Sequence, residues 1–207
     1  MRIHAPIIRA ITSFKQRAAR FARDGRGVAA VEFAFIAPVL LCLYFVTMEV
    51  AQAIEANKKV GRAASMIADL VTQQQSEITP GAVLEPIMAI GEATLQPYNR
   101  TTLNAVVTGI KIDDTGKVIA KWSWKMVNGV FSRAAAQDST TTVPAKLKIN
   151  DTFLVRVEAS LAYQPVITWT AGQKQTLGLM SAFDQINMKE IFYLRPRMTQ
   201  EIACVGC

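Results

Sequence analysis

A long uncharged apolar run near the start of the chain constrains the fold more than any other feature. The run extends from Phe33 to Met48 and directly follows a carboxylate, Glu32. The wider segment from Val28 to Val50 has 23 residues. As a helix it would measure about 34 Å, which is enough to cross a hydrocarbon core of about 30 Å. We therefore predict a membrane-spanning helix over residues 28–50.

The positive charge of the chain is concentrated before this run. Seven of the 23 Lys and Arg residues lie within residues 1–27, where Asp24 is the one acidic residue, whereas the rest of the chain is nearly balanced. Basic residues beside an apolar span are typical of a cytoplasmic flank. A nucleic-acid-binding arm is the competing interpretation, but its aromatic residues are only Phe14 and Phe21, and we expect no nucleic acid partner. Residues 1–27 are thus predicted to form a basic cytoplasmic leader.

A cleavable secretory signal is an alternative interpretation of the apolar run. Such signals have a short apolar core of about 7 to 15 residues, followed by a cleavage site between small residues. Here the run is longer and passes at Glu49 into a charged helical pattern, so we expect the span to be retained. Apolar residues at three- and four-residue spacing predict that the helix continues to about Gln75, with residues 51–76 as an amphipathic continuation. Pro38 is expected to loosen the helix locally.

The remaining residues, 77–207, have the pattern of a small extracytoplasmic α+β head. Thr79-Pro80 predicts the capped start of a second helix that ends before Pro97 and folds back on the first. Residues rich in β-branched and aromatic side chains predict strands, and polar residues predict a loop over 172–178. The predicted strands cover 102–112, 118–126, 152–163 and, at the sheet edge, 189–194, with a hairpin turn at 113–117. The expected fold is a long membrane-spanning helix whose amphipathic continuation packs on a small antiparallel sheet.

Several kinds of chemistry are excluded or disfavoured for this head. His4 is the only histidine, and because it lies in the leader, histidine-dependent catalysis and histidine zinc sites are not available outside. No glycine-rich phosphate-binding motif occurs. Asp113 and Asp114 fit a solvated turn better than a cation site. We expect no enzyme activity, no cofactor and no metal.

The three cysteines have separate interpretations. Cys204 and Cys207 have the spacing of a redox motif, but such motifs usually rely on a helix N-terminus to activate a thiol. In an oxidising compartment a short structural disulfide between Cys204 and Cys207 is the favoured interpretation. Cys42 falls within the apolar run and is expected to be an unpaired apolar filler.

Gly27, Val28 and Glu32 carry the functional interpretation. A carboxylate at the mouth of a bilayer-spanning helix costs free energy and needs a partner. Gly27 offers an accessible backbone for cleavage at the cytoplasmic face, and cleavage after it would free the α-amine of Val28. Val28 and Glu32 share a helix face, and a carboxylate in the first turn suits the helix dipole. The amine and the carboxylate can therefore pair, and between packed helices this pairing would set their axial register.

The string Arg26-Gly27-Val28-Ala29-Ala30-Val31-Glu32-Phe33-Ala34, with Pro38 downstream, resembles a type IV prepilin signal. More specifically, residues 23–75 resemble the start of TadE-like proteins, the pseudopilins of the tight-adherence (Tad/Flp) pilus system. The resemblance implies a pilin-like α+β fold, processing by a prepilin peptidase after Gly27, and assembly roles for Glu32 and Phe33.

The same resemblance implies partners and a location. The partners would be the prepilin peptidase, the other Tad pilins and pseudopilins, the Tad inner-membrane platform and the membrane itself. The protein would be a single-pass bacterial inner-membrane protein with a cytoplasmic N-terminus and a periplasmic head, and it would act as a minor pilin or pseudopilin in pilus assembly.

Two other interpretations are open. In the first, Glu32 is a boundary charge in an unprocessed single-pass envelope protein whose head binds a partner through an exposed platform of Trp122 and Trp124. These tryptophans share one face of a predicted strand, and the opposing expectation is that they pack under the helix. In the second, the head is an enzyme that works without histidine.

Overall fold

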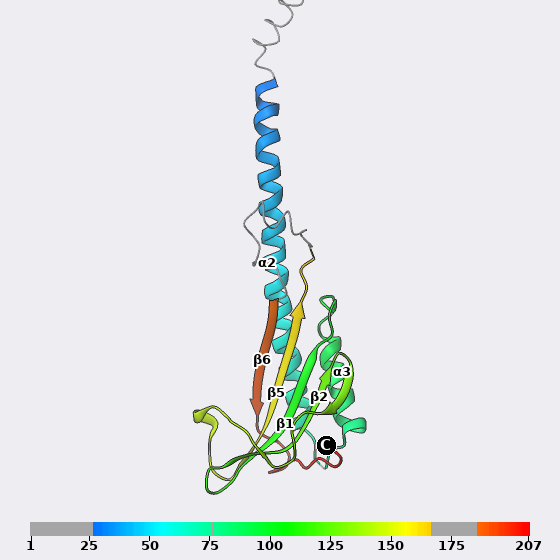
Figure 1. Ribbon diagram of the computed structural model, residues 1–207, viewed down its shortest axis with the longest axis vertical. Coiled ribbons are helices and arrows are strands. Elements are labelled where there is room, and N and C mark those ends of the chain that lie inside the picture. The colour runs from blue at the N-terminus through cyan, green and yellow to red at the C-terminus, as the bar shows by residue number, and fades with distance from the viewer. Residues whose placement is uncertain (1–26, 76, 167–185) are drawn as a thin grey trace, which may run out of the picture. The chain divides into compact units, whose positions relative to one another are not determined.

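The computed structural model describes residues 27–75, 77–166 and 186–207 (Figure 1). It consists of two compact units, one ending at Met48 and the other comprising Glu49–Cys207. One α-helix, α2, extends from Val28 to Thr72 and contributes residues to both units. The predicted continuation of the first helix is therefore confirmed, with its end three residues before the expected one. The leader residues 1–26 and the predicted loop at 172–178 lie outside the described residues.

The first unit contains the apolar half of α2. Its large apolar side chains are exposed around the helix, and Phe35 reaches a relative exposure of 75%. Pro38 lies inside this half, and the helix continues on both sides of it. Among the described residues, α2 is the one helix long and apolar enough to cross a membrane. Because this half has no internal core, its stability depends on a surrounding apolar medium or on neighbouring helices.

The second unit is built on an antiparallel sheet (Figure 1). Its strand order is β3-β2-β1-β5-β6, with the short β4 also pairing with β2. The strands are β1 Asn104–Ile112, β2 Val118–Val127, β3 Val130–Arg133, β4 Ser139–Thr140, β5 Thr152–Tyr163 and β6 Ile186–Leu194. The four predicted strands are confirmed, and β5 has the predicted bounds. The edge strand β6 begins three residues earlier than expected.

The second helical segment differs from its prediction in two details. It begins as a π-helical turn, η2, over Pro80–Leu84, and continues as α3 over Glu85–Ala93. Pro80 occupies the first turn as expected, but Thr79 makes no side-chain capping hydrogen bond. The wide π turn instead takes backbone hydrogen bonds from Val83 and Leu84 to the Thr79 carbonyl. A short 3₁₀ helix, η3, covers Ala145–Leu147.

The second half of α2 and helix α3 pack against one face of the sheet (Figure 1). Buried residues on α2 recur at helical spacing and are mostly small. Two glycines lie where a side chain would not fit: a Cβ at Gly91 of α3 would overlap Ile67 of α2, and one at Gly109 of β1 would overlap the Trp122 and Phe153 rings. The α2 residues in this core are Ala56, Val60, Ala63, Ala64, Ile67, Ala68 and Val71.

The hairpin between β2 and β3 was not predicted, although the sequence contains its signal. Asn128 and Gly129 form the two-residue loop, and both have positive φ, at 51° and 76°. Two successive positive φ values define a turn type that favours Asn-Gly, because glycine and asparagine tolerate the left-handed region. The pair Asn-Gly between two β-rich segments therefore indicated β3.

Candidate assembly site

The residues of the predicted processing and assembly signal lie together at the start of α2. Gly27 immediately precedes the helix, and Val28 is its first residue. Glu32 is exposed, and so is Phe33, at 66%. One detail of the expectation is wrong: no acidic residue lies in the first turn of α2, because Glu32 is its fifth residue. The dipole interaction with Glu32 is correspondingly weaker, since this effect decays within the first turn.

This start of α2 is continuous with a large apolar surface. In the first unit every side of the helix presents exposed large apolar residues. A contiguous patch of this kind marks a membrane or protein contact. Its members include Val28, Val31, Phe33, Phe35, Ile36, Val39, Leu40, Leu41, Leu43, Tyr44 and Phe45.

The transition between the two halves of α2 is made by a buried carboxylate. Glu49 is 3% exposed, whereas the apolar Val50 and Ile54 nearby are 47% and 53% exposed. The carboxylate can be buried while nearby apolar side chains are exposed because Glu49 has hydrogen-bonding partners at and just after the end of β5. Tyr163 Oη donates to Glu49 Oε1 at 2.8 Å, and the Val166 backbone N–H donates to both carboxylate oxygens at 3.1 and 3.0 Å. These contacts fix the end of β5 to the helix.

The donor in this contact is held in its protonated state. Burial raises the pKa of Tyr163 well above its ordinary value of 10.0, and the hydrogen bond to Glu49 raises it further. The phenol therefore remains a donor across the whole physiological pH range. Sequence reasoning missed Glu49 because its partners are 114 and 117 residues away. The signal available in the sequence was an acid at the exact end of an uncharged run.

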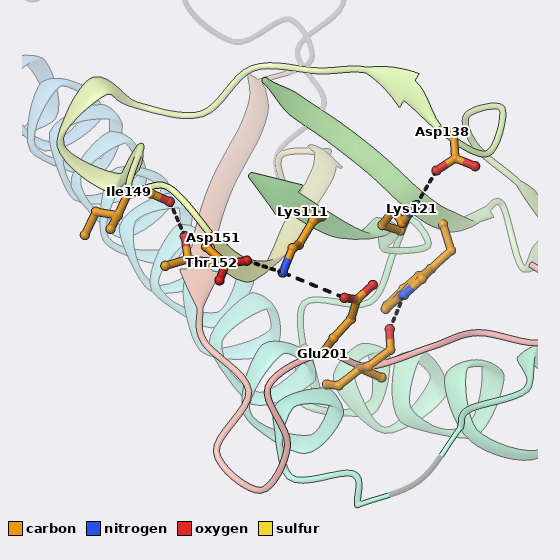
Figure 2. Close-up of polar contacts among 9 residues, drawn as sticks. Lys111, Lys121, Asp138, Ile149, Asp151, Thr152 and Glu201 are labelled. Carbon is orange, nitrogen blue, oxygen red and sulfur yellow. Dashed lines mark hydrogen bonds and ion pairs between the residues drawn. The ribbon is translucent and has the colours of Figure 1, made fainter. Parts of the chain in front are cut away.

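The opposite end of β5 carries a separate set of polar contacts, shown in Figure 2. Lys111 Nζ lies 3.0 Å from Asp151 Oδ1 and 4.0 Å from Glu201 Oε2, and Lys121 pairs with Asp138 at 2.6 Å. These pairs are partly exposed and contribute little free energy each. No group of three or more potential metal ligands occurs among the residues that the structure describes.

The adjacent acids of the β1–β2 turn have structural contacts. Asp113 Oδ1 accepts hydrogen bonds from the Thr115 hydroxyl and from the Lys117 backbone N–H, both at 2.7 Å. The Thr115 hydrogen bond, followed by that from Lys117, lowers the pKa of Asp113 below 3.8. The Asp114 carbonyl accepts from Asn150 at 2.7 Å. Asp113 is therefore a turn-forming residue, as the sequence indicated.

The tail after β6 returns to the core of the second unit. Ile202 is buried, and its carbonyl accepts a hydrogen bond from Trp122 Nε1 at 2.7 Å. A parallel bridge joins Ile78 to Cys204, and a disulfide joins Cys204 to Cys207. Cys207 itself is buried, at 5% exposure. The disulfide thus closes a tail that side-chain burial and backbone hydrogen bonds already attach to the core.

The tryptophan pair does not form an exposed platform. Trp122 is 3% exposed and belongs to the core beneath α2, and Trp124 is partly buried against the same core. The two residues share the sheet face that the helix covers, because side chains two apart on a strand point the same way. The prediction of an exposed binding platform formed by Trp122 and Trp124 is therefore wrong.

Comparison with known proteins gives one match. Residues 27–69 match the family described as TadE-like protein, and this segment contains Gly27, Glu32 and the buried Glu49. No curated protein and no solved structure matches the chain. The match begins at the residue that precedes α2 and ends within its packed half. The similarity to the TadE-like family therefore lies in this N-terminal segment of the chain.

Proposed function

We propose that this protein is a pseudopilin or minor pilin of the Tad pilus system, anchored in the bacterial inner membrane by the first half of α2. The observation that carries the proposal is the coincidence of the TadE-like match with the exposed apolar half of the helix. A membrane and, later, a bundle of neighbouring helices would cover that surface. The predicted head, residues 77–207, and the packed half of α2 would lie in the periplasm, on the side opposite the basic leader.

Processing by a prepilin peptidase after Gly27 is part of this proposal. Among the described residues, no atom lies within 4 Å of the position where a Cβ of Gly27 would lie, which supports an accessible backbone at this bond. Cleavage at this bond would remove the basic leader and give Val28 a charged amine at the start of the helix. The new amine would lie one helical turn from Glu32 and could compensate its charge in a low-dielectric environment.

Between subunits the same pair of charges would fix the axial register of packed helices. An exposed carboxylate at the start of an otherwise apolar helix is costly in lipid unless it finds a positive partner. The amine of a neighbouring Val28 is a partner at nearly the same height. Other Tad pilins, the pseudopilins and the inner-membrane assembly platform are the proposed partners of this segment.

The processing step is tested by the intact mass and the N-terminal sequence of the protein purified from membranes. A start at Val28 supports the proposal. A mature pool that still begins with the basic leader would instead identify an unprocessed envelope protein with a single anchor.

The role of Glu32 is tested by Glu32→Gln, which removes the charge and keeps the shape. The variant should enter the membrane normally but reduce the number of pili per cell severalfold, since each buried pair is expected to contribute a few kcal/mol. Glu77→Gln is the matched control, because Glu77 is exposed and lies in the head. Wild-type piliation by Glu32→Gln would refute the register role.

A further inference from the structure

The two faces of the sheet in the second unit differ in what covers them. One face carries the core under α2 and α3, to which Val155, Val157 and Ala159 of β5 belong. The β5 residues between these point to the other face, which we call the outer face. Near the β1–β2 turn, the segment before β5 covers this face through Val143 and Leu147. Further along the strands, large apolar side chains of the outer face are exposed in the described structure.

The strand register places several of these exposed residues side by side. Lys125 of β2 pairs with Val106 of β1, Val106 pairs with Glu158 of β5, and Glu158 pairs with Ile191 of β6. Side chains two residues apart on a strand share a face, which adds one further residue from β2 and one from β6. We define the outer patch as Val106, Lys125, Val127, Glu158, Lys189 and Ile191. Its apolar members Val127 and Ile191 are 39% and 43% exposed.

The outer patch has an excess of positive charge. Glu158 is its one acid, and it already contacts two cations: Arg156 Nε lies 3.1 Å from Oε1, and Lys189 Nζ lies 2.8 Å from Oε2. Lys125 forms no ion pair among the residues that the structure describes. With Arg156 included, three positive groups face one negative group, which gives a charge of +2. A complementary partner therefore presents apolar side chains together with unpaired acids.

Another surface of the same chain has this chemistry. Ile87 and Met88 of α3 are buried in the core, whereas Ala89, Ile90 and Ala93 face outward, and Ile90 is 50% exposed. The segment 77–96 contains three glutamates, at 77, 85 and 92, and no lysine or arginine. Lys59 of α2 donates a hydrogen bond to the carbonyl of residue 96 at 2.6 Å, and with it the charge is −2. None of the three glutamates forms an ion pair within the described ranges.

The two surfaces also match in extent, and they cannot meet within one chain. Pro80–Leu84 and Glu85–Ala93 together have 14 residues, which rise about 20 Å as a helix. The strands β2, β1, β5 and β6 are adjacent, and their axes span about 14 Å at a spacing of about 4.8 Å. The helix is therefore long enough to cross all four strands. Because α3 packs on the face opposite the outer patch, a contact between them requires two copies.

We propose that the outer patch of one copy binds the exposed face of α3 from a second copy. The contact uses a different surface on each partner, so every copy keeps one free patch and one free α3, and the contact repeats from copy to copy. A single helix on a small sheet buries less than the roughly 800 Å² per partner of a standard interface. The contact is accordingly weak by itself. The inference deepens the assembly role proposed above by naming a partner and the surfaces that join.

The test uses cross-linking between two different full-length variants in detergent micelles. Both carry Cys42→Ser, which removes the free thiol of the described chain, while Cys204 and Cys207 stay joined. One variant adds Ile90→Cys on α3. The other adds Ser160→Cys, which changes little in size and lies beside the outer patch, since Ser160 pairs with Lys189. After addition of a short bismaleimide, the mixture should give a covalent dimer that contains one chain of each variant.

A matched control measures cross-linking by random collision. Ser65→Cys is the same replacement at a partly exposed position on α2, away from the outer face. Mixed with the Ile90→Cys variant, it should give severalfold less dimer than Ser160→Cys gives. Equal yields from the two mixtures would overturn the proposal. Dimers that form as readily from Ile90→Cys alone would show a symmetric contact and would also overturn it.

Charge reversal tests the complementarity of the two surfaces. Lys125→Glu, added to the Ser160→Cys variant, should lower the yield of mixed dimer by about threefold, the size expected of one exposed ion pair. Glu92→Lys, added to the Ile90→Cys variant, should lower it similarly. Both reversals together should restore much of the yield. A loss that does not recover in the doubly reversed mixture, with both proteins folded by near-ultraviolet circular dichroism, would refute the charge matching.

The same preparations separate this inference from the proposed function. A protein that begins at Val28 and is inserted in membranes, but gives no mixed dimer above the control, refutes the interface and leaves the pseudopilin proposal intact. A protein that retains its leader and still gives the mixed dimer refutes the processing step and supports the interface.

Discussion

The two halves of α2 have the same backbone geometry and opposite surroundings. Residues 28–48 expose large apolar side chains on all sides, whereas residues 49–72 bury a stripe of mostly small side chains against the sheet. Leu40 is 54% exposed, and Ile67 is fully buried. The first half follows the pattern of a helix that is surrounded by an apolar medium, and the second that of a helix with one packed face.

The two halves therefore differ in side-chain size as well as in exposure: the exposed half has large apolar side chains, and the packed half has mostly small ones. Alanines at 56, 63, 64 and 68 belong to the core that the second half shares with the sheet. The first half instead carries phenylalanine and leucine, and these large side chains are exposed in the described structure. The boundary between the halves is Glu49, the first residue of α2 whose polar group is bound by the head.

Removal of the first half of α2 should have the largest effect, which is a change in whether the protein partitions into membranes. A chain that begins at Glu49 should remain in the soluble fraction and unfold cooperatively, because residues 49–207 form a compact unit with its own core. The full-length protein should sediment with membranes and resist carbonate extraction. A truncated chain that still sediments with membranes would show that the head also binds the bilayer strongly.

A pair of leucine-sized truncations should distinguish the halves by stability. Ile67→Ala should lower the free energy of unfolding of the head by about 2 to 5 kcal/mol, because it leaves a cavity under the sheet. Leu40→Ala should leave the same free energy unchanged, because Leu40 is 54% exposed and belongs to the other unit. Denaturant unfolding followed by tryptophan fluorescence measures both, and equal losses would contradict the division of α2 into two units.

The terminal disulfide should have a smaller effect. Replacing both cysteines, as Cys204→Ser with Cys207→Ser, opens a loop of four residues, for which chain entropy predicts a loss of about 2 kcal/mol. The tail also retains the Trp122 hydrogen bond and the Ile78 bridge. Cys42→Ser serves as the control, because Cys42 is a free cysteine in the first half. A Cys42→Ser variant as destabilised as the double variant would be inconsistent with this assignment.

The smallest effect should come from the exposed β1–β2 turn, and it should depend on pH. Because folding lowers the pKa of Asp113 below 3.8, the ionised carboxylate stabilises the turn above that value. The stabilisation is lost as the pH falls through the lower folded pKa. Asp113→Ala should therefore destabilise the head slightly at pH 7 and much less at pH 2.5. Asp114→Ala, which keeps the backbone carbonyl bound to Asn150, is the matched control at both pH values.

Local patterns were sufficient to predict much of this fold. The β5 bounds follow from alternation, since Phe153, Val155 and Val157 are buried while Arg156 and Glu158 face the other side. The helical repeat beyond the apolar run likewise predicts the packed half of α2. Val50 and Ile54 break this repeat and stay exposed, whereas Glu49 and Ala56 on the same stretch of α2 are buried.

Contacts between distant residues were not predictable in this way. Glu49 could be recognised as a boundary residue, but nothing local indicates that Tyr163 and Val166 bind it. The same holds for Ile78, whose backbone pairs with the tail near Cys204. The π-helical turn after Thr79 was also missed, because the Thr-Pro pair predicts a helix start without specifying its hydrogen-bond spacing.

The attachment of β5 to Glu49 has a mechanical consequence. β5 is paired along its length with β1 on one side and β6 on the other, and its final residue Tyr163 is bound to the helix. Tension applied along α2 would enter the sheet through this inner strand and load its hydrogen bonds in shear. Many bonds would then have to break together, so the head should resist pulling forces better than a sheet loaded from its edge.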